Sequence, residues 1–172
     1  MLRLTRPAAK PKISTTVHAL STVPGTVMAK FATAELGVGN AAILIDNSSD
    51  YAKGLAQFFK ENFVKEGGAV TAEESYLQKD TDFKATLTKI KATKSGLFVC
   101  AGYYQEVGLI VKQARELGMN MPIAGGDGWD SAKMPEIAGA AALNNTYFSS
   151  LYSPEDSSDI NKNFVAAYEK AY

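Results

Sequence analysis

The chain has 172 residues, of which 46% are hydrophobic and 21% are charged. This composition is typical of a globular protein with enough length for one core, and it argues against a disordered chain. The 18 basic residues balance the 18 acidic residues. No net field therefore favours nucleic acid or a membrane surface as a partner.

The single cysteine, Cys100, excludes an intramolecular disulfide. It follows three apolar residues, so we expect a small buried side chain; a nucleophile would need an imidazole, and the only histidine is His18. The opening stretch, "MLRLTRPAAKPK", has no apolar core of signal-peptide length, and no stretch reaches the roughly 18 apolar residues of a membrane span. We therefore expect neither an export signal nor a membrane helix in this chain.

Residues 1–24 show little periodicity and are expected to form a tail or a partial element, whereas residues 25–172 alternate regularly and form one lobe. Apolar spacing, glycine stops and capping residues predict the boundaries of each element. Helices are expected at 25–36, at 50–65, at 82–94 with Asp82 as the cap, at 105–117, at 131–138, and at 159–172 with Ile160, Phe164 and Tyr168 on one stripe. Strands are expected at 41–46, 69–76, 97–100, 121–126 and 145–150.

Strands that alternate with helices of this length pair in parallel through right-handed crossovers. The sequence therefore predicts an α/β fold: a Rossmann-like, doubly wound, mainly parallel sheet of about five strands flanked by helices.

Ligands of open α/β sheets bind at the carboxyl ends of the strands, and three predicted strands end in residues suited to one ligand. Tyr51 follows the first strand in "DNSSDYAKG", Tyr103 follows the third in "AGYYQE", and Asp127 and Trp129 follow the fourth in "GGDGWD". Aromatic faces can surround an ammonium group or an apolar side chain, and a carboxylate can hold the ammonium. We expect these four residues to bind a ligand.

Each of these residues also has a purely structural interpretation. A tyrosine at a strand end can pack or cap, Asp127 and Asp50 can cap the helices that follow them, and Trp129 can pack in the core or under a lid. The coincidence of all of them at one sheet edge favours the binding interpretation.

Motifs for other chemistry are incomplete. "GVGN" precedes its strand, where a dinucleotide fingerprint needs glycines after it, and no Walker loop is present. The segment from Asp46 begins like a calcium loop, but Tyr51 replaces the loop glycine and Gln57 the bidentate glutamate. We therefore expect no catalytic residues, no cofactor and no metal site.

Five stretches carry a resemblance to a known family: "AAILIDNSSDYAKGLAQFFKENF", "DTDFKATLTKIKA", "AGYYQEVGLIVKQARELG", "MPIAGGDGWDS" and "IAGAAALNNTYFSSLYSPED". From about Gly25 to Tyr172 the chain resembles the C-terminal lobe of the leucine/isoleucine/valine-type periplasmic amino-acid-binding proteins, the solute-binding components of ABC transporters. The resemblance implies a type I periplasmic-binding fold, in which two lobes close over an amino acid.

The resemblance also implies roles for individual residues. The family's two tyrosines fall on Tyr51 and Tyr103, and its acid for the ligand ammonium, often glutamate, falls on Asp127; Tyr104 is expected to pack. The family is about twice this length, and the N-terminal lobe that would bind the ligand carboxylate is absent from this sequence.

The resemblance implies a periplasmic or extracytoplasmic location and an ABC permease as partner of the full-length protein. We expect a non-enzymatic binding lobe for a branched-chain amino acid, weak by itself. One alternative is a lobe that forms a homodimer through its exposed cleft face. A nucleotide- or phosphate-using enzyme is a further alternative, but it lacks a phosphate-binding glycine loop.

Overall fold

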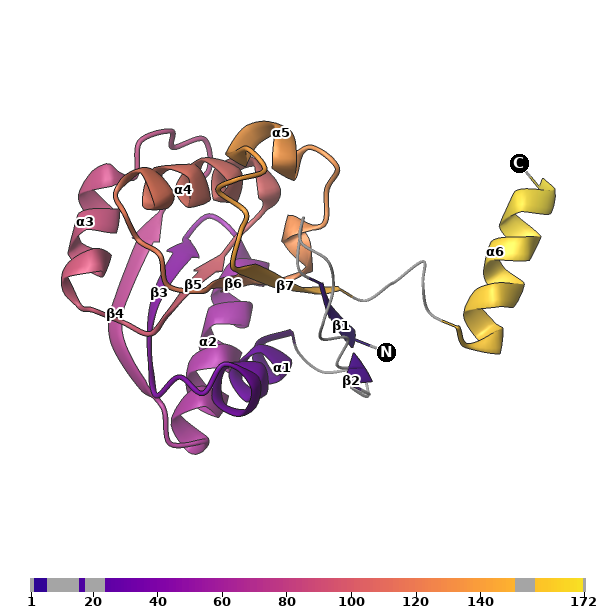
Figure 1. Ribbon diagram of the computed structural model, residues 1–172, viewed down its shortest axis with the longest axis horizontal. Helices are drawn as coiled ribbons and strands as arrows, with labels where there is room; N and C mark the ends of the chain where they lie inside the picture. Colours follow the sequence, from indigo (N-terminus) through magenta and orange to yellow (C-terminus); the bar gives the residue numbers. More distant parts are fainter. Residues whose placement is uncertain (1, 6–15, 18–23, 151–156, 172) are drawn as a thin grey trace.

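The computed structural model describes residues 2–5, 16–17, 24–150 and 157–171. In its centre is a seven-stranded sheet with the strand order β2-β1-β7-β6-β5-β3-β4 (Figure 1). The strands are β1 (Leu2–Thr5), β2 (Thr16–Val17), β3 (Asn40–Asp46), β4 (Ala69–Tyr76), β5 (Leu97–Ala101), β6 (Ile123–Gly125) and β7 (Thr146–Ser150).

Five of the strands, from β7 through β6, β5 and β3 to β4, are parallel. All five residues of β5 are buried, as an apolar strand between two helix layers should be. This confirms the predicted parallel sheet of about five strands. Within the segment expected to be a tail or a partial element, β1 and β2 add two short antiparallel strands beside β7.

Helices cover both faces of the sheet, α1 and α2 on one side and α3, α4 and α5 on the other (Figure 1). Their bounds are α1 (Pro24–Lys30), α2 (Asp50–Lys65), α3 (Lys84–Ala92), α4 (Tyr104–Glu116) and α5 (Met134–Ala138), with a π-helical turn η1 (Phe31–Glu35) and a 3-10 turn η2 (Asp127–Trp129).

Each helix layer closes its own apolar core. On the α1–α2 side, Phe59 and Phe63 of α2 are fully buried, and their rings stack with 5.1 Å between the centroids. On the α3–α4 side, Phe98 of β5 and Ile110 of α4 are fully buried. Burial of each such side chain stabilises the fold by about 1.5–3 kcal/mol, so the parallel sheet is a rigid base for its carboxyl-end loops.

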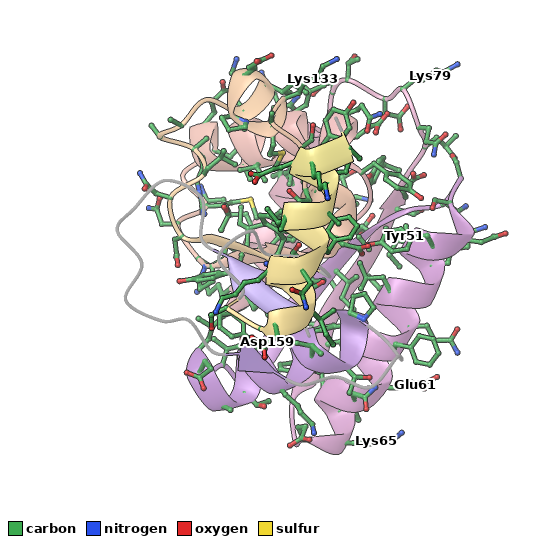
Figure 2. All side chains as sticks on the ribbon, turned by 90° about the vertical axis from the view of Figure 1, so that its right-hand side faces the viewer. Tyr51, Glu61, Lys65, Lys79, Lys133 and Asp159 are labelled. Atoms are coloured by element: carbon green, nitrogen blue, oxygen red, sulfur yellow. The ribbon has the colours of Figure 1, made fainter. Side chains whose placement is uncertain are left out.

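The helix α6 (Asp159–Ala171) stands apart from these layers (Figure 1). Figure 2 views the molecule from that side, with α6 in front of the sheet and helices. Its apolar stripe is exposed: Ile160 is 84%, Phe164 61% and Tyr168 58% accessible. Among the helices in the described ranges, none is long and apolar enough to cross a membrane.

Two predicted helices differ from the structure in detail rather than in place. The helix expected over 25–36 changes after Lys30 into η1, where the Thr33 hydroxyl donates to the carbonyls of Ala29 and Lys30 and disturbs the regular ladder. The helix expected over 82–94 is α3 over Lys84–Ala92, with Phe83 at the N-cap position. The Asp82 carboxylate nevertheless accepts the Lys84 N–H at 3.1 Å, so Asp82 does satisfy a donor of the first turn, as predicted.

Candidate functional site

Three loops at the carboxyl ends of β3, β5 and β6 place the predicted ligand contacts. Tyr51 is the second residue of α2, after β3; Tyr103 is the N-cap of α4, after β5; and Asp127 opens η2, after β6. The crossovers of the parallel sheet separate these residues by 24 to 76 positions in sequence yet bring them to one edge.

A short hydrogen bond joins two of these loops. The Tyr51 hydroxyl donates to Asp127 Oδ1 at 2.6 Å and accepts the Gly128 N–H at 3.2 Å. An O–H···O⁻ bond of this length is charge-assisted and about twice as strong as a neutral bond. The bond therefore fixes the Asp127 carboxylate against the start of α2.

Burial raises the pKa of the Tyr51 phenol well above its usual value, and the hydrogen bond to Asp127 raises it further. The phenol stays protonated throughout the physiological pH range, because both effects disfavour the phenolate. Tyr51 consequently acts as a permanent donor to Asp127.

Tyr103 stands beside Tyr51 with 5.4 Å between the ring centroids and 32° between the ring planes. It is 36% exposed, so part of its ring faces solvent at the sheet edge. The adjacent Tyr104 is partly buried and packs against the core on the α3–α4 side. The two neighbouring tyrosines thus have the divergent placements that the sequence predicts.

Glycines allow the two rings to approach the loop that carries Asp127. A Cβ on Gly126 would overlap the Tyr51 hydroxyl. A Cβ on Gly128 would lie 2.8 Å from the Gly102 carbonyl oxygen and 3.1 Å from Tyr103 Cδ1. Glycine is required at position 128, where the clash is with the main chain, whereas a side chain at position 126 would displace the Tyr51 hydroxyl.

A buried carboxylate beneath the site orders the loop that carries Tyr51. Asp46, at the end of β3, is fully buried and accepts hydrogen bonds from the Ser48 N–H at 2.9 Å and from Gln78 Nε2 at 3.2 Å. Its main-chain carbonyl accepts the Ser49 N–H, and the Ser49 hydroxyl caps the first turn of α2. Asp46 therefore sets the direction in which α2 begins and so positions Tyr51.

The loop that carries Tyr103 rests on a second buried group. The Tyr76 hydroxyl lies directly against Gly102, where a Cβ would overlap it, and has no hydrogen-bond partner among the described residues. Burial raises the pKa of Tyr76 far above its usual value, with smaller contributions from the nearby Cys100 and Asp46. Tyr76 is therefore a neutral support under the backbone that leads to Tyr103.

Trp129 occupies a different environment from the one expected. Its side chain is 2% exposed, belongs to the core on the α3–α4 side, and packs under Gly125. The expectation that Trp129 lines the rim therefore disagrees with its burial. The candidate site that the structure assembles consists of Tyr51, Tyr103 and Asp127.

The cysteine considered as a nucleophile is not exposed at this edge. Cys100 is fully buried, and burial raises the pKa of its thiol; its hypothetical partner His18 lies outside the described residues. In the described part of the chain, no group of three His, Cys, Asp or Glu side chains could hold a metal ion.

A surface hollow of about 540 Å³ lies elsewhere, between α2 and the edge strand β4. Lys60 and Glu73, which form a 2.6 Å ion pair, are both part of its lining. Their charges neutralise each other, and none of the three site residues lines this hollow.

The sequence predicted that Tyr51, Tyr103 and Asp127 share one edge but assigned no role in the site to the groups that hold them. The glycines around Asp127 were a visible signal of close backbone approach. Asp46 was visible only as an acidic residue at a strand end. Nothing in the local sequence indicates that Tyr76 lies under Gly102, because that contact joins β4 to the loop after β5.

Comparison with known proteins gives this geometry a family context. The sequence profile of the periplasmic binding protein family matches residues 4–172. Leu/Ile/Val-binding protein homolog 3 of Brucella melitensis is 31% identical over 116 residues, which are 67% of this chain and 31% of that protein. The leucine-, isoleucine-, valine-, threonine-, and alanine-binding protein of Pseudomonas aeruginosa is 27% identical over 149 residues, 83% of this chain and 40% of that protein.

Solved structures agree. The leucine-binding protein LivK of Thermotoga maritima matches with a TM-score of 0.80 at 35% identity, and LivJ of Streptococcus pneumoniae in complex with isoleucine matches with 0.76 at 36% identity. Each match covers 87% of this chain and 42% of the other. The chain thus spans less than half the length of these relatives, which are named as binding proteins. The resemblance predicted from the sequence is confirmed: the chain belongs to the periplasmic binding protein family.

Proposed function

We propose that this chain is one lobe of a solute-binding protein for branched-chain amino acids and that Asp127 accepts the ligand ammonium group. The observation that carries the proposal is the Asp127 carboxylate, which Tyr51 holds at 2.6 Å on an edge shared with the exposed ring of Tyr103. A fixed carboxylate beside two aromatic rings suits an ammonium group attached to an apolar side chain.

The names of the relatives support the choice of ligand. They include Leu/Ile/Val-binding proteins and a LivJ structure that contains isoleucine. We extend the same class of ligand to this chain because its three site residues stand at the strand ends where this fold binds ligands.

The remaining parts of such a receptor complete the proposal. A second lobe would close over the ligand and supply donors for its carboxylate, and an ABC permease would receive the loaded protein outside the cytoplasm. One lobe leaves a face of the ligand in water, where polar contacts are weak. We therefore expect this chain alone to bind leucine no better than roughly millimolar, about 4 kcal/mol.

Titration with leucine, followed by two-dimensional NMR of the 15N-labelled chain, tests the proposal. The amide signals of Gly126 and Gly128 should shift with leucine, and Asp127→Asn should abolish the shifts. In a reconstituted two-lobe protein the same substitution should reduce affinity by about 1.5–3 kcal/mol, the range for hydrogen bonds to charged groups.

Asp130→Asn is the matched control, because it removes the same charge from an exposed neighbour outside the three-residue site. It should leave the leucine shifts unchanged. If Asp127→Asn bound leucine as the wild type does, Asp127 would not be the ammonium site.

The exposed ring of Tyr103 favours a second candidate function, self-association through the same edge. Light scattering coupled to size-exclusion chromatography should then detect a dimer that Tyr103→Lys dissociates. A monomer at all accessible concentrations would reject this second function and leave the first intact.

A further inference from the structure

We infer that the site on this chain takes primary amines with an apolar chain, whether or not they carry a carboxylate. The inference rests on the proposed function, since it concerns the ligand class of the same site. Two observations support the inference. Some hydrogen-bonding groups at the edge already have partners within the protein, and the charges near the edge are negative.

Asp127 still has an oxygen for a cation. Tyr51 donates to Oδ1, and the structure shows no hydrogen bond to Oδ2 from another described residue. The side chain is only partly buried, so a ligand can reach it. An ammonium group carries three donors and no acceptor, which suits a carboxylate that needs one more donor.

Tyr51 has no hydrogen left for a ligand carboxylate. Its single hydroxyl hydrogen is committed to Asp127 at 2.6 Å, and its oxygen already accepts the Gly128 N–H. Release of that hydrogen to a ligand would break a charge-assisted bond to a carboxylate in exchange for a bond to another carboxylate. Tyr51 therefore offers a ligand its ring rather than its hydroxyl.

The charges near the edge also disfavour an anion. Besides Asp127, Glu106 lies in the first turn of α4, where it accepts the Lys79 N–H at 2.9 Å. Tyr103 gives the main-chain N–H groups of that turn no side-chain cap, and Glu106 is the acidic residue within the turn. A ligand carboxylate would enter this negative field.

Lysines do not compensate for these acids. In the described ranges, the ion pairs of the structure join Lys53 to Asp50, Lys60 to Glu73 and Lys89 to Glu74. The labelled Lys79 and Lys133 lie at the top of Figure 2, away from Tyr51. The edge thus recognises a cation with an apolar chain and is indifferent or unfavourable to an added carboxylate.

Three compounds that share the isobutyl side chain of leucine test the inference on the wild-type chain. Leucine carries both charged groups, 3-methylbutylamine lacks the carboxylate, and 4-methylpentanoate lacks the ammonium. Each is titrated into 15N-labelled protein at equal ionic strength, and the shifts of Gly126 and Gly128 are followed.

We expect 3-methylbutylamine to bind at least as tightly as leucine, and 4-methylpentanoate to cause no shift at these glycines. Leucine binding tenfold or more tighter than the amine would overturn the inference and leave the proposed function standing. Binding of 4-methylpentanoate at the same glycines would also overturn it. If neither leucine nor the amine shifted these signals, the proposed function would fail together with the inference.

Tyr51→Phe supplies a second, independent readout. Because the hydroxyl contacts Asp127 and not the ligand carboxylate, its loss should weaken leucine and 3-methylbutylamine by the same factor. The ratio of the two affinities should stay within twofold of the wild-type ratio. A selective loss of leucine would show that the hydroxyl binds the carboxylate, and the inference would be wrong.

Discussion

Helices α2 and α6 carry the same spacing of apolar residues and end in opposite environments. Leu55, Phe59 and Phe63 recur every four residues on α2 and are at most 4% exposed. On α6, Ile160, Phe164 and Tyr168 recur at the same interval and are 58–84% exposed. Periodicity determines which side of a helix is apolar, whereas only a tertiary partner can bury that side.

The partner of α2 is visible in the structure. Gly25 of α1 lets that helix approach the backbone of α2 closely, and the sheet closes the other side of the same stripe. The first turn of α2 also carries Tyr51 to the candidate site. Burial of its stripe is therefore what holds one residue of the candidate site in place.

The largest expected effect tests this contrast directly. Phe59→Ala removes a fully buried ring that stacks on Phe63, and it should reduce the free energy of unfolding by about 3–5 kcal/mol. Phe164→Ala on the exposed stripe of α6 should change it by less than about 0.5 kcal/mol. Urea denaturation followed by the fluorescence of the buried Trp129 measures both. Equal losses would show that α6 is buried in solution and would break the contrast.

Regular elements with strong local signals were predicted closely from the sequence. The predicted ranges of α2 and β4 coincide with the observed ones. Apolar residues recur at helical spacing before Gly67 and Gly68, and the spacing changes to that of a strand after them. Gly67 has a positive φ of 87°, which suits a glycine stop after a helix.

Features that depend on distant contacts were not predicted. Phe83 takes the N-cap position of α3 because its N–H donates to the Gln113 side chain from α4 at 2.8 Å. Arg115 also lies beyond local prediction: its guanidinium donates to main-chain carbonyls on two loops, including Met121 and Asn144, each at 2.9 Å. Such long-range polar contacts leave no periodic signal.

The candidate site divides in the same way. The placement of Tyr51, Tyr103 and Asp127 at one edge could be predicted because parallel strands bring their carboxyl ends together. The direction of each side chain could not, since Trp129 turns into the core two residues after Asp127. Which side chains point outward depends on packing that the sequence alone does not give.

The second prediction sharpens the contrast at the start of α2. Tyr51→Phe removes the hydrogen bond to Asp127 and leaves the Gly128 N–H without its acceptor. It should reduce the free energy of unfolding by about 1.5–3 kcal/mol, as expected for a hydrogen bond to a charged group. Tyr104→Phe is the control, because its hydroxyl forms no hydrogen bond to a described residue; it should change stability little.

The pKa shift of Tyr51 adds a pH dependence to the same pair of proteins. Its pKa is raised in the folded state, first by burial and then by the bond to Asp127, so the unfolded chain loses this proton at a lower pH. The contribution is complete below about pH 10, the usual tyrosine pKa, and is lost as the pH rises above it. The stability difference between wild type and Tyr51→Phe should therefore be constant below that pH and shrink above it. A difference that stayed constant at higher pH would contradict the raised pKa.

The third prediction concerns the close approach of α1 to α2. A Cβ at position 25 would lie 2.6 Å from the Phe59 nitrogen and 2.7 Å from the Leu55 carbonyl oxygen. Overpacking costs about 1–3 kcal/mol, of which the better helix propensity of alanine offsets up to about 1 kcal/mol. Gly25→Ala should therefore be destabilising by about 1–2 kcal/mol in urea denaturation. Ala166→Leu, at an exposed position of α6, should have no such cost; a comparable loss would indicate that α6 is also packed closely.

The smallest expected effect concerns the solvent-exposed side of α2, where side chains should contribute as little to the free energy of unfolding as those on α6. Lys60 Nζ and Glu73 Oε2 are 2.6 Å apart, but the two side chains are 50% and 43% exposed. Water screens such a pair, and ordering of two long side chains costs entropy, so exposed ion pairs contribute about 0.2–1 kcal/mol. A double-mutant cycle with Lys60→Ala and Glu73→Ala should give a coupling energy in this range, and 1 M salt should reduce it. A salt-independent coupling above about 2 kcal/mol would mean that the pair is shielded from solvent and that the outer side of α2 contributes to the fold as its buried stripe does.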